Sequence, residues 1–462
     1  CLEAVYRISR LPLAGQILGP ASCRVTYAQH EPREGKTLRF AQLYVPEPVG
    51  QILAGRVVAE ILSPSRNFKL VVREGEKKEN HVFEVWNKQL IVAVKDLKTD
   101  HRQVLVHELF GHASWSPDER SILYIAEKKR DEVVSVWDSP SGNKNVYRET
   151  LGETMYHVED PGLFIYHWEE KKVEAIPVSQ DVMPAYPTFH PIEAEYIYIG
   201  YKKHAYTLGL RWMLDRATVF FRVRIGAEPQ VLELPEIYMA AILPKFSSNG
   251  KLMLIGVPHT LAHATCNALI SLDWATNQFK TVVEVYDQST PKYSGLHGYH
   301  DSLIRGGWLT NDTYIFETVH RSSNTIFTVN TEGSIQELPI PVSKPFSASL
   351  LDIYNGDALL QAGTVTKLPS IYRYSAATQE ISLVEPNVPE PFTQEERVVT
   401  DILGRVKTQV ILHTDTDMES TLYWTSPENP LLVSVHSGPH GLSTADYIPF
   451  KVALLLKGTT FC

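Results

Sequence analysis

Cysteine is scarce in this sequence, which has four cysteines in 462 residues, at positions 1, 23, 266 and 462. None of them forms a Cys-x-x-Cys motif or any other close pair, so neither a disulfide framework nor a four-thiolate zinc site is indicated. Such sparse cysteine usage is typical of a reducing compartment. We therefore expect a cytoplasmic protein. We also expect no metal and no other cofactor.

Basic residues are not in excess either. The chain has 44 Lys and Arg against 53 Asp and Glu, which gives a net charge of −9, and its basic residues are mostly scattered singly or in pairs. Nucleic acid is a dense polyanion that binds proteins through concentrated basic patches. The sequence therefore predicts no nucleic-acid partner.

Long apolar runs are absent. Runs such as 238–243 and 452–456 fall far short of the roughly 20 residues that a membrane-spanning helix needs, so we expect no membrane partner. The first residues lack the basic and apolar segments of a signal peptide. The chain begins with Cys rather than Met and stops inside an apolar stretch, so both ends look cut.

Short strands dominate what is present. With 44% hydrophobic and 21% charged residues, the composition is that of a folded globule. A turn of the Ser-Pro-Asp or Asn-Gly type recurs before an alternating apolar strand, which indicates antiparallel β structure. Such strands are expected at 69–72, 122–125, 196–200, 252–255, 314–316 and 359–360.

A second apolar strand followed by a hairpin turn completes the repeating unit. The intervals between turns cluster near the ~40–50 residues of a four-stranded propeller blade. We therefore predict a mainly β fold with a β-propeller over 24–384; the alternative is a β-sandwich, which does not repeat a composite unit of this length. These second strands are expected at 133–137, 268–272, 325–329 and 371–374.

After the propeller, the Pro-rich and acidic stretch 385–395 is interpreted as a linker. Residues 396–462 then predict the start of a truncated α/β domain. The expected elements are a strand over 405–413, a buried strand over 431–435, a helix over 448–457 that stops at Gly458, and a further strand from 459.

A loop of the form His-x-Gly-Pro follows the predicted buried strand. In an α/β-hydrolase such a loop forms one side of the oxyanion hole, because glycine lets a backbone N–H approach the reacting carbonyl. A simple Gly-Pro turn is the alternative. The loop comprises His436, Ser437, Gly438, Pro439 and His440.

No catalytic nucleophile can be named, because Gly-x-Ser-x-Gly is absent from the 462 residues. His436 and His440 could serve as a base, although a histidine beside Gly and Pro is more often structural. Two further groups have spacings that only loosely suggest metal ligands, and we interpret both as loops. They are His259, His263 and Cys266, and His297, His300 and Asp301.

The chain resembles the acylaminoacyl-peptidases, also called acylamino-acid-releasing enzymes or acylpeptide hydrolases, of the prolyl oligopeptidase family of serine peptidases. The likeness runs over nearly the whole chain. Its strongest pieces are 6–20, 83–86, 114–116, 123–130, 208–211, 272–274 and 436–440.

The resemblance implies a β-propeller, usually seven-bladed, that gates substrate access to an α/β-hydrolase domain on which segment 1–23 packs. It also implies a hydrolase that uses a Ser-Asp-His triad to release N-acylated, typically N-acetylated, amino acids from the amino end of short peptides. The Gly438 N–H is the one oxyanion-hole donor that carries over. The resemblance is compatible with a homo-oligomer.

Three departures from the family pattern matter. Ser437 stands where the family commonly has Gly, and the stretch 168–187 looks short, which suggests an incomplete blade. The chain also ends before the nucleophile elbow, so none of the triad is present and this chain alone is predicted to be inactive. The alternative function is a non-catalytic propeller scaffold that binds peptides or proteins.

Overall fold

The computed structural model describes most of the chain. The described residues are 5–6, 9–19, 22–31, 36–44, 49–52, 56–76, 80–88, 90–106, 109–129, 135, 137, 150–152, 155, 158–204, 216–259, 266–286, 293, 295–297, 305–385, 394–415, 418–435 and 443–461.

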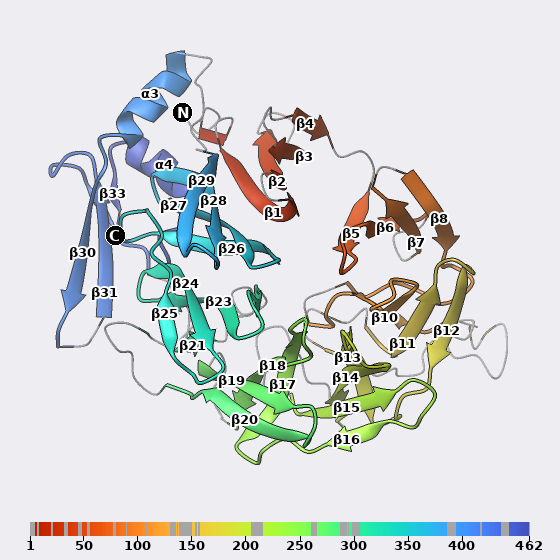
Figure 1. The fold of residues 1–462 in the computed structure, drawn as a ribbon. Coiled ribbons are helices and arrows are strands. Elements are labelled where there is room, and N and C mark those ends of the chain that lie inside the picture. The colour runs from red at the N-terminus through yellow and green to blue at the C-terminus, as the bar shows by residue number, and fades with distance from the viewer. Residues whose placement is uncertain are drawn as a thin grey trace. The chain divides into compact units, whose positions relative to one another are not determined.

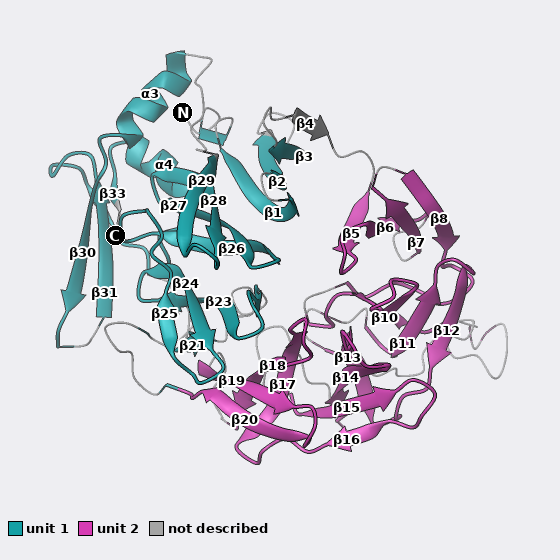
Figure 2. Cartoon of the chain, in the orientation of Figure 1, with its two compact units in different colours: residues 1–54, 286–462 teal, residues 55–285 magenta. Residues whose placement is uncertain are grey.

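Two compact units divide the chain (Figure 2). One contains residues 1–54 together with 286–462, and the other contains residues 55–285. Each unit is built mainly of short antiparallel strands that follow one another along the chain (Figure 1).

The unit of residues 55–285 contains four successive up-and-down sheets, β5–β8, β9–β12, β13–β16 and β17–β20. Its strands are β5 (Val57–Leu62), β6 (Phe68–Glu74), β7 (His81–Asn87), β8 (Leu90–Asp96), β9 (Ser114–Trp115), β10 (Ser121–Glu127), β11 (Pro161–His167), β12 (Lys172–Ile176), β13 (Val182–Phe189), β14 (Glu195–Lys202), β15 (Thr218–Arg224), β16 (Gln230–Leu232), β17 (Tyr238–Phe246), β18 (Leu252–Pro258), β19 (Cys266–Asp273) and β20 (Gln278–Val283).

The other unit contains the sheet β1–β4, an eight-stranded sheet and a C-terminal sheet with two helices. Its elements are β1 (Arg10–Gly19), β2 (Ser22–Glu31), β3 (Lys36–Tyr44), β4 (Val49–Ile52), β21 (Leu296–His297), β22 (Gly306–Trp308), β23 (Thr313–His320), β24 (Ser323–Asn330), β25 (Ile335–Glu337), β26 (Ser347–Tyr354), β27 (Asp357–Thr364), β28 (Lys367–Ser375), β29 (Glu380–Glu385), α3 (Gln394–Leu403), β30 (Lys407–His413), β31 (Met418–Trp424), β32 (Leu431–Leu432), α4 (Pro449–Leu456) and β33 (Thr460–Phe461).

Four-stranded meanders of this kind are the blades of a β-propeller, so the predicted repeat is confirmed. The strands expected from the first half of the repeat are the second strands of their four-stranded meanders: β6, β10, β14, β18, β23 and β27. Those expected from the second half are the third strands β19, β24 and β28, whereas 133–137 lies almost wholly outside the described residues. The sheets on either side of 168–187 each have four strands, so neither blade lacks a strand.

The expectation of seven separate blades is wrong. Five four-stranded meanders, β1–β4 through β17–β20, belong to separate sheets, but β22–β29 form one eight-stranded sheet. A single parallel pair, Asn324 with Ser347, joins β24 to β26. The Asn324 amide strengthens this junction by donating to the Ala348 carbonyl at 2.8 Å, so hydrogen bonds merge what would otherwise be two meanders.

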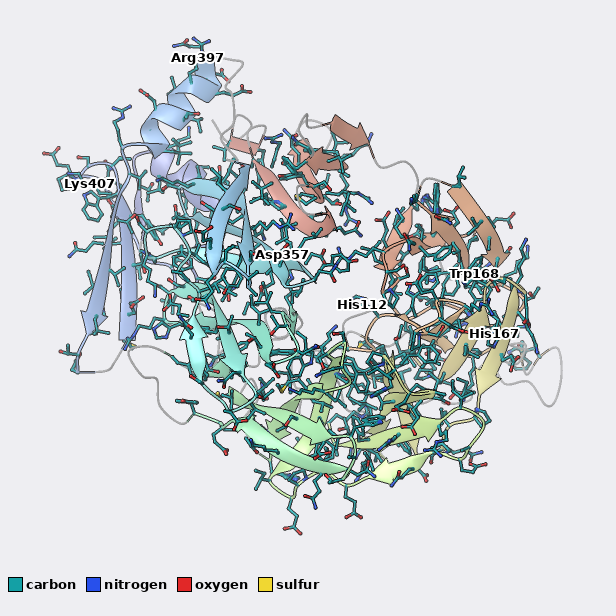
Figure 3. All side chains as sticks on the ribbon, in the orientation of Figure 1. His112, His167, Trp168, Asp357, Arg397 and Lys407 are labelled. Carbon is teal, nitrogen blue, oxygen red and sulfur yellow. The ribbon has the colours of Figure 1, made fainter. Side chains whose placement is uncertain are left out.

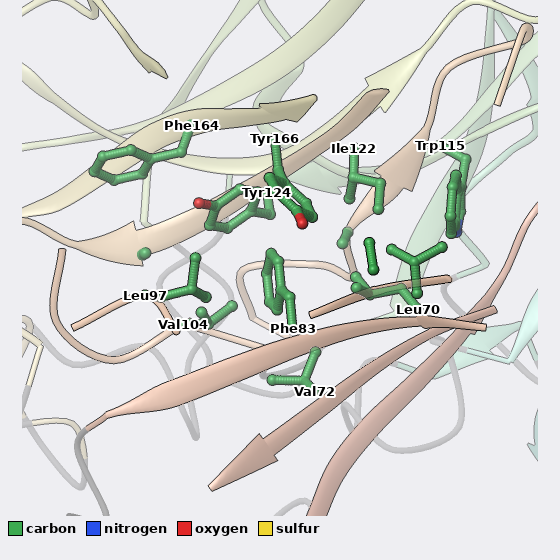
Figure 4. Packing of buried hydrophobic residues seen from close by; sticks show 14 residues of the cluster. Leu70, Val72, Phe83, Leu97, Val104, Trp115, Ile122, Tyr124, Phe164 and Tyr166 are labelled. Carbon is green, nitrogen blue, oxygen red and sulfur yellow. The ribbon is translucent and has the colours of Figure 1, made fainter. Parts of the chain in front are cut away.

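A hydrophobic core fills the space between the sheets β5–β8 and β9–β12 (Figure 4). Phe83 is fully buried there, with its ring 5.0 Å from Tyr124 and 5.6 Å from Tyr166. Strand β10 is buried at six consecutive residues, 122–127, because neighbouring elements cover both of its faces. Packing of this kind explains why residues 122–126 of β10 are apolar without interruption.

His101 is buried at the edge of this core. Its Nδ1 lies 2.8 Å from the Arg102 carbonyl and its Nε2 lies 2.8 Å from the Tyr124 hydroxyl. Because a carbonyl can only accept, Nδ1 carries the proton and Nε2 accepts from Tyr124, so one neutral tautomer satisfies both contacts. Burial lowers the pKa of His101 to about 4, although the Arg102 carbonyl favours the charged form.

This pKa shift predicts that the protein loses stability in mild acid. The unfolded chain has a His101 pKa near its ordinary value of 6.5, so it binds the proton first as the pH falls. The contribution of neutral His101 to the free energy of unfolding is therefore complete above pH ~6.5 and is lost as the pH falls toward ~4. At pH ~4.5 the loss is roughly 2 kcal/mol. Urea unfolding at about pH 7 and pH 4.5 should therefore show a smaller difference for His101→Gln than for wild type. If the two proteins lose the same unfolding free energy between pH 7 and pH 4.5, the prediction is contradicted. Any effect of the buried His81 is the same in both proteins and so does not affect the comparison.

The C-terminal residues do not form an α/β-hydrolase domain. Within the described part of the chain there are two α-helices, α3 and α4, and beyond α3 there is one small sheet with the order β30-β31-β33-β32. The helix expected over 448–457 and the strand after Gly458 are confirmed as α4 and β33. The pairing of β32 with β33 is parallel and spans only two residue pairs, so the sheet is too small for the expected domain.

One face of helix α3 is buried against neighbouring residues and the opposite face is exposed. Val399 is buried in a cluster with Val5 and Tyr447, whereas Arg397 is exposed, as is Lys407 at the start of β30 (Figure 3). Residues 386–393, which form most of the predicted linker, lie outside the described residues. Among the helices that the structure describes, none combines the length and apolar character needed to cross a membrane.

Candidate functional site

The predicted oxyanion loop itself lies outside the described residues, and this applies to His436, Ser437, Gly438, Pro439 and His440. The structure describes the chain up to residue 435 and again from residue 443. The structure describes the two segments that flank the loop in the sequence, and these are set out in turn.

The segment before the loop is more exposed than the sequence predicts. Instead of a buried strand over 431–435, only Leu431–Leu432 form a strand, β32. Leu431 is 59% exposed and Val435 is 80% exposed. The expectation of a buried strand is wrong because, among the strands that the structure describes, β32 lies at the edge of its sheet and pairs with β33.

The segment after the loop is held by the turn between β23 and β24. The Ala445 N–H donates to the Ser322 carbonyl at 2.9 Å. The Ser322 N–H in turn donates to Glu419 Oε1 on β31 at 3.1 Å. Ala445 is fully enclosed, packing with Val365, Tyr423 and Leu455.

Two residues further on, a second contact holds the same segment. The Ser9 hydroxyl lies 3.2 Å from the Tyr447 hydroxyl and 2.6 Å from the Val5 carbonyl. Because the carbonyl can only accept, Ser9 donates to Val5. Burial raises the pKa of Tyr447, and the contact with Ser9 opposes that rise, so Tyr447 is a neutral phenol that serves as a structural anchor.

The charges beside this anchor are one acid and one base. Asp446 accepts a hydrogen bond from the Thr444 hydroxyl. Burial lowers the pKa of Lys451 on α4, and the charge of Asp446 partly opposes the shift.

A second polar cluster joins two blades rather than forming a site. The Arg222 guanidinium lies 3.9 Å from the centre of the Trp274 ring and donates to Glu195 at 2.7 Å. His190 stacks on the same tryptophan at 4.8 Å. Burial raises the pKa of Glu195, but Arg222 and Arg224 outweigh that effect and the net pKa is lowered. The contacts of Arg222 and His190 with Trp274 thus join sheet β13–β16 to sheet β17–β20, whereas the ion pair of Arg222 with Glu195 lies within sheet β13–β16.

The two groups with metal-like spacings are only partly described. His259, Cys266 and His297 lie in the described part, whereas His263, His300 and Asp301 do not. Among the described residues, no group of three or more His, Cys, Asp and Glu side chains is arranged to hold a metal ion.

Sequence reasoning did not find Ser9, Ser322, Glu419 or Tyr447. Glu419 is 97 residues from Ser322, and Ser9 is 438 residues from Tyr447. None of these residues belongs to a local motif. The single available signal was the position of Tyr447 shortly after the His-x-Gly-Pro loop.

The propeller blades and the His-x-Gly-Pro sequence both point to the peptidases that the chain resembles. Comparison with known proteins establishes the family. The family model described as "Acylamino-acid-releasing enzyme, N-terminal domain" matches residues 41–398, well over half of the chain. The chain belongs to this family. It corresponds to the N-terminal propeller portion of acylamino-acid-releasing enzymes, which agrees with the absence of the triad from its 462 residues.

Individual relatives support the assignment to the acylamino-acid-releasing enzyme family. The enzyme of this name from Mus musculus is 25% identical over 98% of this chain and 70% of its own length. The enzyme from Homo sapiens is 24% identical over the same shares.

Solved structures agree on the fold. The acylaminoacyl peptidase of Pyrococcus horikoshii has a TM-score of 0.65 at 13% identity, over 99% of this chain and 65% of its own. An acylaminoacyl peptidase in complex with Z-Gly-Gly-Phe-chloromethyl ketone has a TM-score of 0.67 at 12% identity, over the same shares. The chain thus spans slightly less than two thirds of these solved chains, and at this identity the likeness establishes the β-propeller fold alone.

Proposed function

We propose that this chain is the N-terminal, substrate-admitting part of a serine oligopeptidase that releases N-acylated amino acids from the amino end of short peptides. The observation that carries the proposal is the match of the family model over residues 41–398. The relatives are named for the release of acylamino acids, and one solved relative is a complex with Z-Gly-Gly-Phe-chloromethyl ketone. The substrate class for this chain is therefore a short peptide with a blocked amino end.

Within that function, the Gly438 N–H is a donor to the oxyanion of the tetrahedral intermediate. The support is chemical, since in the sequence His436 to His440 the glycine N–H stands between Ser437 and Pro439, and glycine permits close approach to the reacting carbonyl. The chain contributes this donor and no member of the triad. Ser, Asp and His must be supplied by further sequence in the active enzyme.

The propeller part limits which substrates reach the catalytic groups. This limit on access is supported by the stiffness of the blades. Buried central strands and ring contacts such as that of Phe83 with Tyr124 resist deformation. Short flexible peptides would be admitted and folded proteins would be rejected.

An assay with two forms of the protein tests the proposed function. N-acetylalanine p-nitroanilide is offered to the 462-residue chain and to a longer form that also carries Ser, Asp and His. We expect turnover by the longer form and none by the 462-residue chain. Turnover by the shorter chain would contradict the account of the missing triad. Peptide binding by the longer form without turnover would instead favour the scaffold function.

A further inference from the structure

The turn between the first and second strands of a blade recurs with one kind of cap. In four described blades a hydroxyl just after the first strand accepts a hydrogen bond from the backbone of its own turn, as serine and threonine commonly do. A hydroxyl does not titrate near neutral pH, so these turns are insensitive to mild acid. The contacts are Ser63 with the Phe68 N–H (3.1 Å), Ser116 with the Ser121 N–H (3.0 Å), Ser247 with the Lys251 N–H (2.9 Å) and Thr310 with the Thr313 N–H (3.1 Å).

His190 occupies the same place in the turn between β13 and β14. Its Nδ1 accepts from the Ile192 N–H at 3.2 Å and from the Glu193 N–H at 2.8 Å. The His190 N–H donates to the Glu195 carbonyl at 2.9 Å, which closes a turn as long as the one that Ser63 closes with the Phe68 carbonyl at the same distance. Because an N–H can only donate, Nδ1 carries no proton, and the proton of the neutral ring lies on Nε2.

The same imidazole also packs against the next blade. Its ring centre lies 4.8 Å from that of Trp274 and 4.9 Å from that of Phe246, and His190 is 3% exposed. A side chain at Gly250 would meet Nε2 at 2.7 Å, so the ring is also in close contact with the turn between β17 and β18. One titratable side chain thus caps its own turn and joins sheet β13–β16 to sheet β17–β20.

The surroundings of His190 favour its neutral form. Burial, the largest influence, lowers the pKa of His190 below its ordinary 6.5, and the charge of Arg222 on β15 acts in the same direction. Glu193, Glu195 and a hydrogen bond with the Gly250 backbone oppose the shift. The two side chains that the next blade stacks on the ring, Phe246 and Trp274, carry no charge.

A proton on Nδ1 removes what holds the ring in place. Nδ1 would become a donor that faces two backbone donors, and the new charge would lie beside Arg222, whose guanidinium stacks on the same Trp274 at 3.9 Å. Since the folded-state pKa is below the unfolded one, the stabilisation by neutral His190 is complete above pH ~6.5 and is lost as the pH falls toward the folded-state pKa.

We propose that His190 makes the junction between sheets β13–β16 and β17–β20 a pH-sensitive joint that opens locally in mild acid. Protonation releases the imidazole from the Ile192 and Glu193 N–H groups and withdraws it from Trp274. Turns capped by a hydroxyl stay closed at the same pH. The inference goes beyond the proposed peptidase function and does not depend on it.

Amide hydrogen exchange of the 462-residue chain at pH 7.5 and pH 5.0 tests the joint, with rates corrected for the pH dependence of intrinsic exchange. We expect the Ile192 and Glu193 amides to lose about tenfold in protection at pH 5.0. The turn at Thr310 is the internal control, because its hydroxyl also accepts from two backbone N–H groups, those of Asp312 and Thr313. Its amides should change less than about twofold.

Two variants show whether His190 is the group that titrates. His190→Ser introduces the cap of the other blades and should remove the difference between the two pH values. His259→Ser removes an exposed histidine and should keep it. The proposal is overturned if wild type shows no greater loss at Ile192 and Glu193 than in the Thr310 turn, or if His190→Ser shows the wild-type loss. The wild-type comparison lies within one molecule, so it decides the matter even where His190→Ser does not fold.

Discussion

Replacement of Phe83 by alanine should lower the free energy of unfolding by about 3–5 kcal/mol. Phe83 is 0% exposed, and its ring packs against Tyr124 and Tyr166 between the sheets β5–β8 and β9–β12. Removing the ring loses the free energy gained by burying it away from water, and it also loses the aromatic contacts. The stiff sheets cannot close the resulting cavity. Urea unfolding followed by tryptophan fluorescence measures the effect.

Leu90→Ala is the control for this prediction. Leu90 lies on β8 in the same blade as Phe83, but it is 73% exposed. Exposed positions of this kind change stability by no more than about 0.5 kcal/mol. A Phe83→Ala effect as small as that of Leu90→Ala would contradict the packing described between these two blades.

Loss of the Gly438 N–H should have the largest effect on catalysis. Gly438→Pro removes this donor, and the absence of one oxyanion-hole donor typically lowers kcat by about 10²–10³. The measurement is the turnover of N-acetylalanine p-nitroanilide by the longer form that carries the triad. We expect KM to change much less than kcat, because the donor acts on the transition state.

Two variants at the same loop separate the lost N–H from a general disturbance. Gly438→Ala keeps the donor and should lose much less activity than Gly438→Pro. Ser437→Gly restores the residue that the family commonly has there and should cost no activity. Equal losses in Gly438→Ala and Gly438→Pro would show that chain conformation, and not the donor, is what the substitution disturbs.

The central strands of the blades could be predicted from the sequence because they are buried on both faces. Strand β18 and residues 122–126 of β10 are apolar without a break and follow recognisable turns, so their pattern is strong. The outer strands have no such signal. In β12, for instance, Lys172 and Glu174 face water, and the strand is defined by its pairing with β11.

The sheet β1–β4 was not foreseen as a repeat. Its first strand contains Pro12, Gly15 and Gly19, which weaken any strand pattern. The structure gives the reason for Gly15: a side chain there would meet Leu359 at 2.6 Å and Leu351 at 2.9 Å. The glycine that obscures the pattern is thus what allows β1 to pack closely against β26 and β27.

The number of separate sheets and the contacts of the segment after the loop were both hard to predict for one reason. Both depend on contacts between distant residues, namely Asn324 with Ser347 in the first case, and Ser322 with Glu419 and Ala445 in the second. No local periodicity encodes such pairings. The loop motif could be recognised from its residue types, but the contacts of the segment that follows it could not.

The most direct test of the proposed peptidase function compares the products from two forms of one peptide. A short peptide with an N-acetylated amino end and the same peptide with a free amino end are incubated with the longer form, and the products are identified by mass spectrometry. The account predicts release of the N-acetylated first residue from the blocked peptide and no comparable cleavage of the free one. Equal cleavage of both peptides, or cleavage at internal bonds alone, would contradict it.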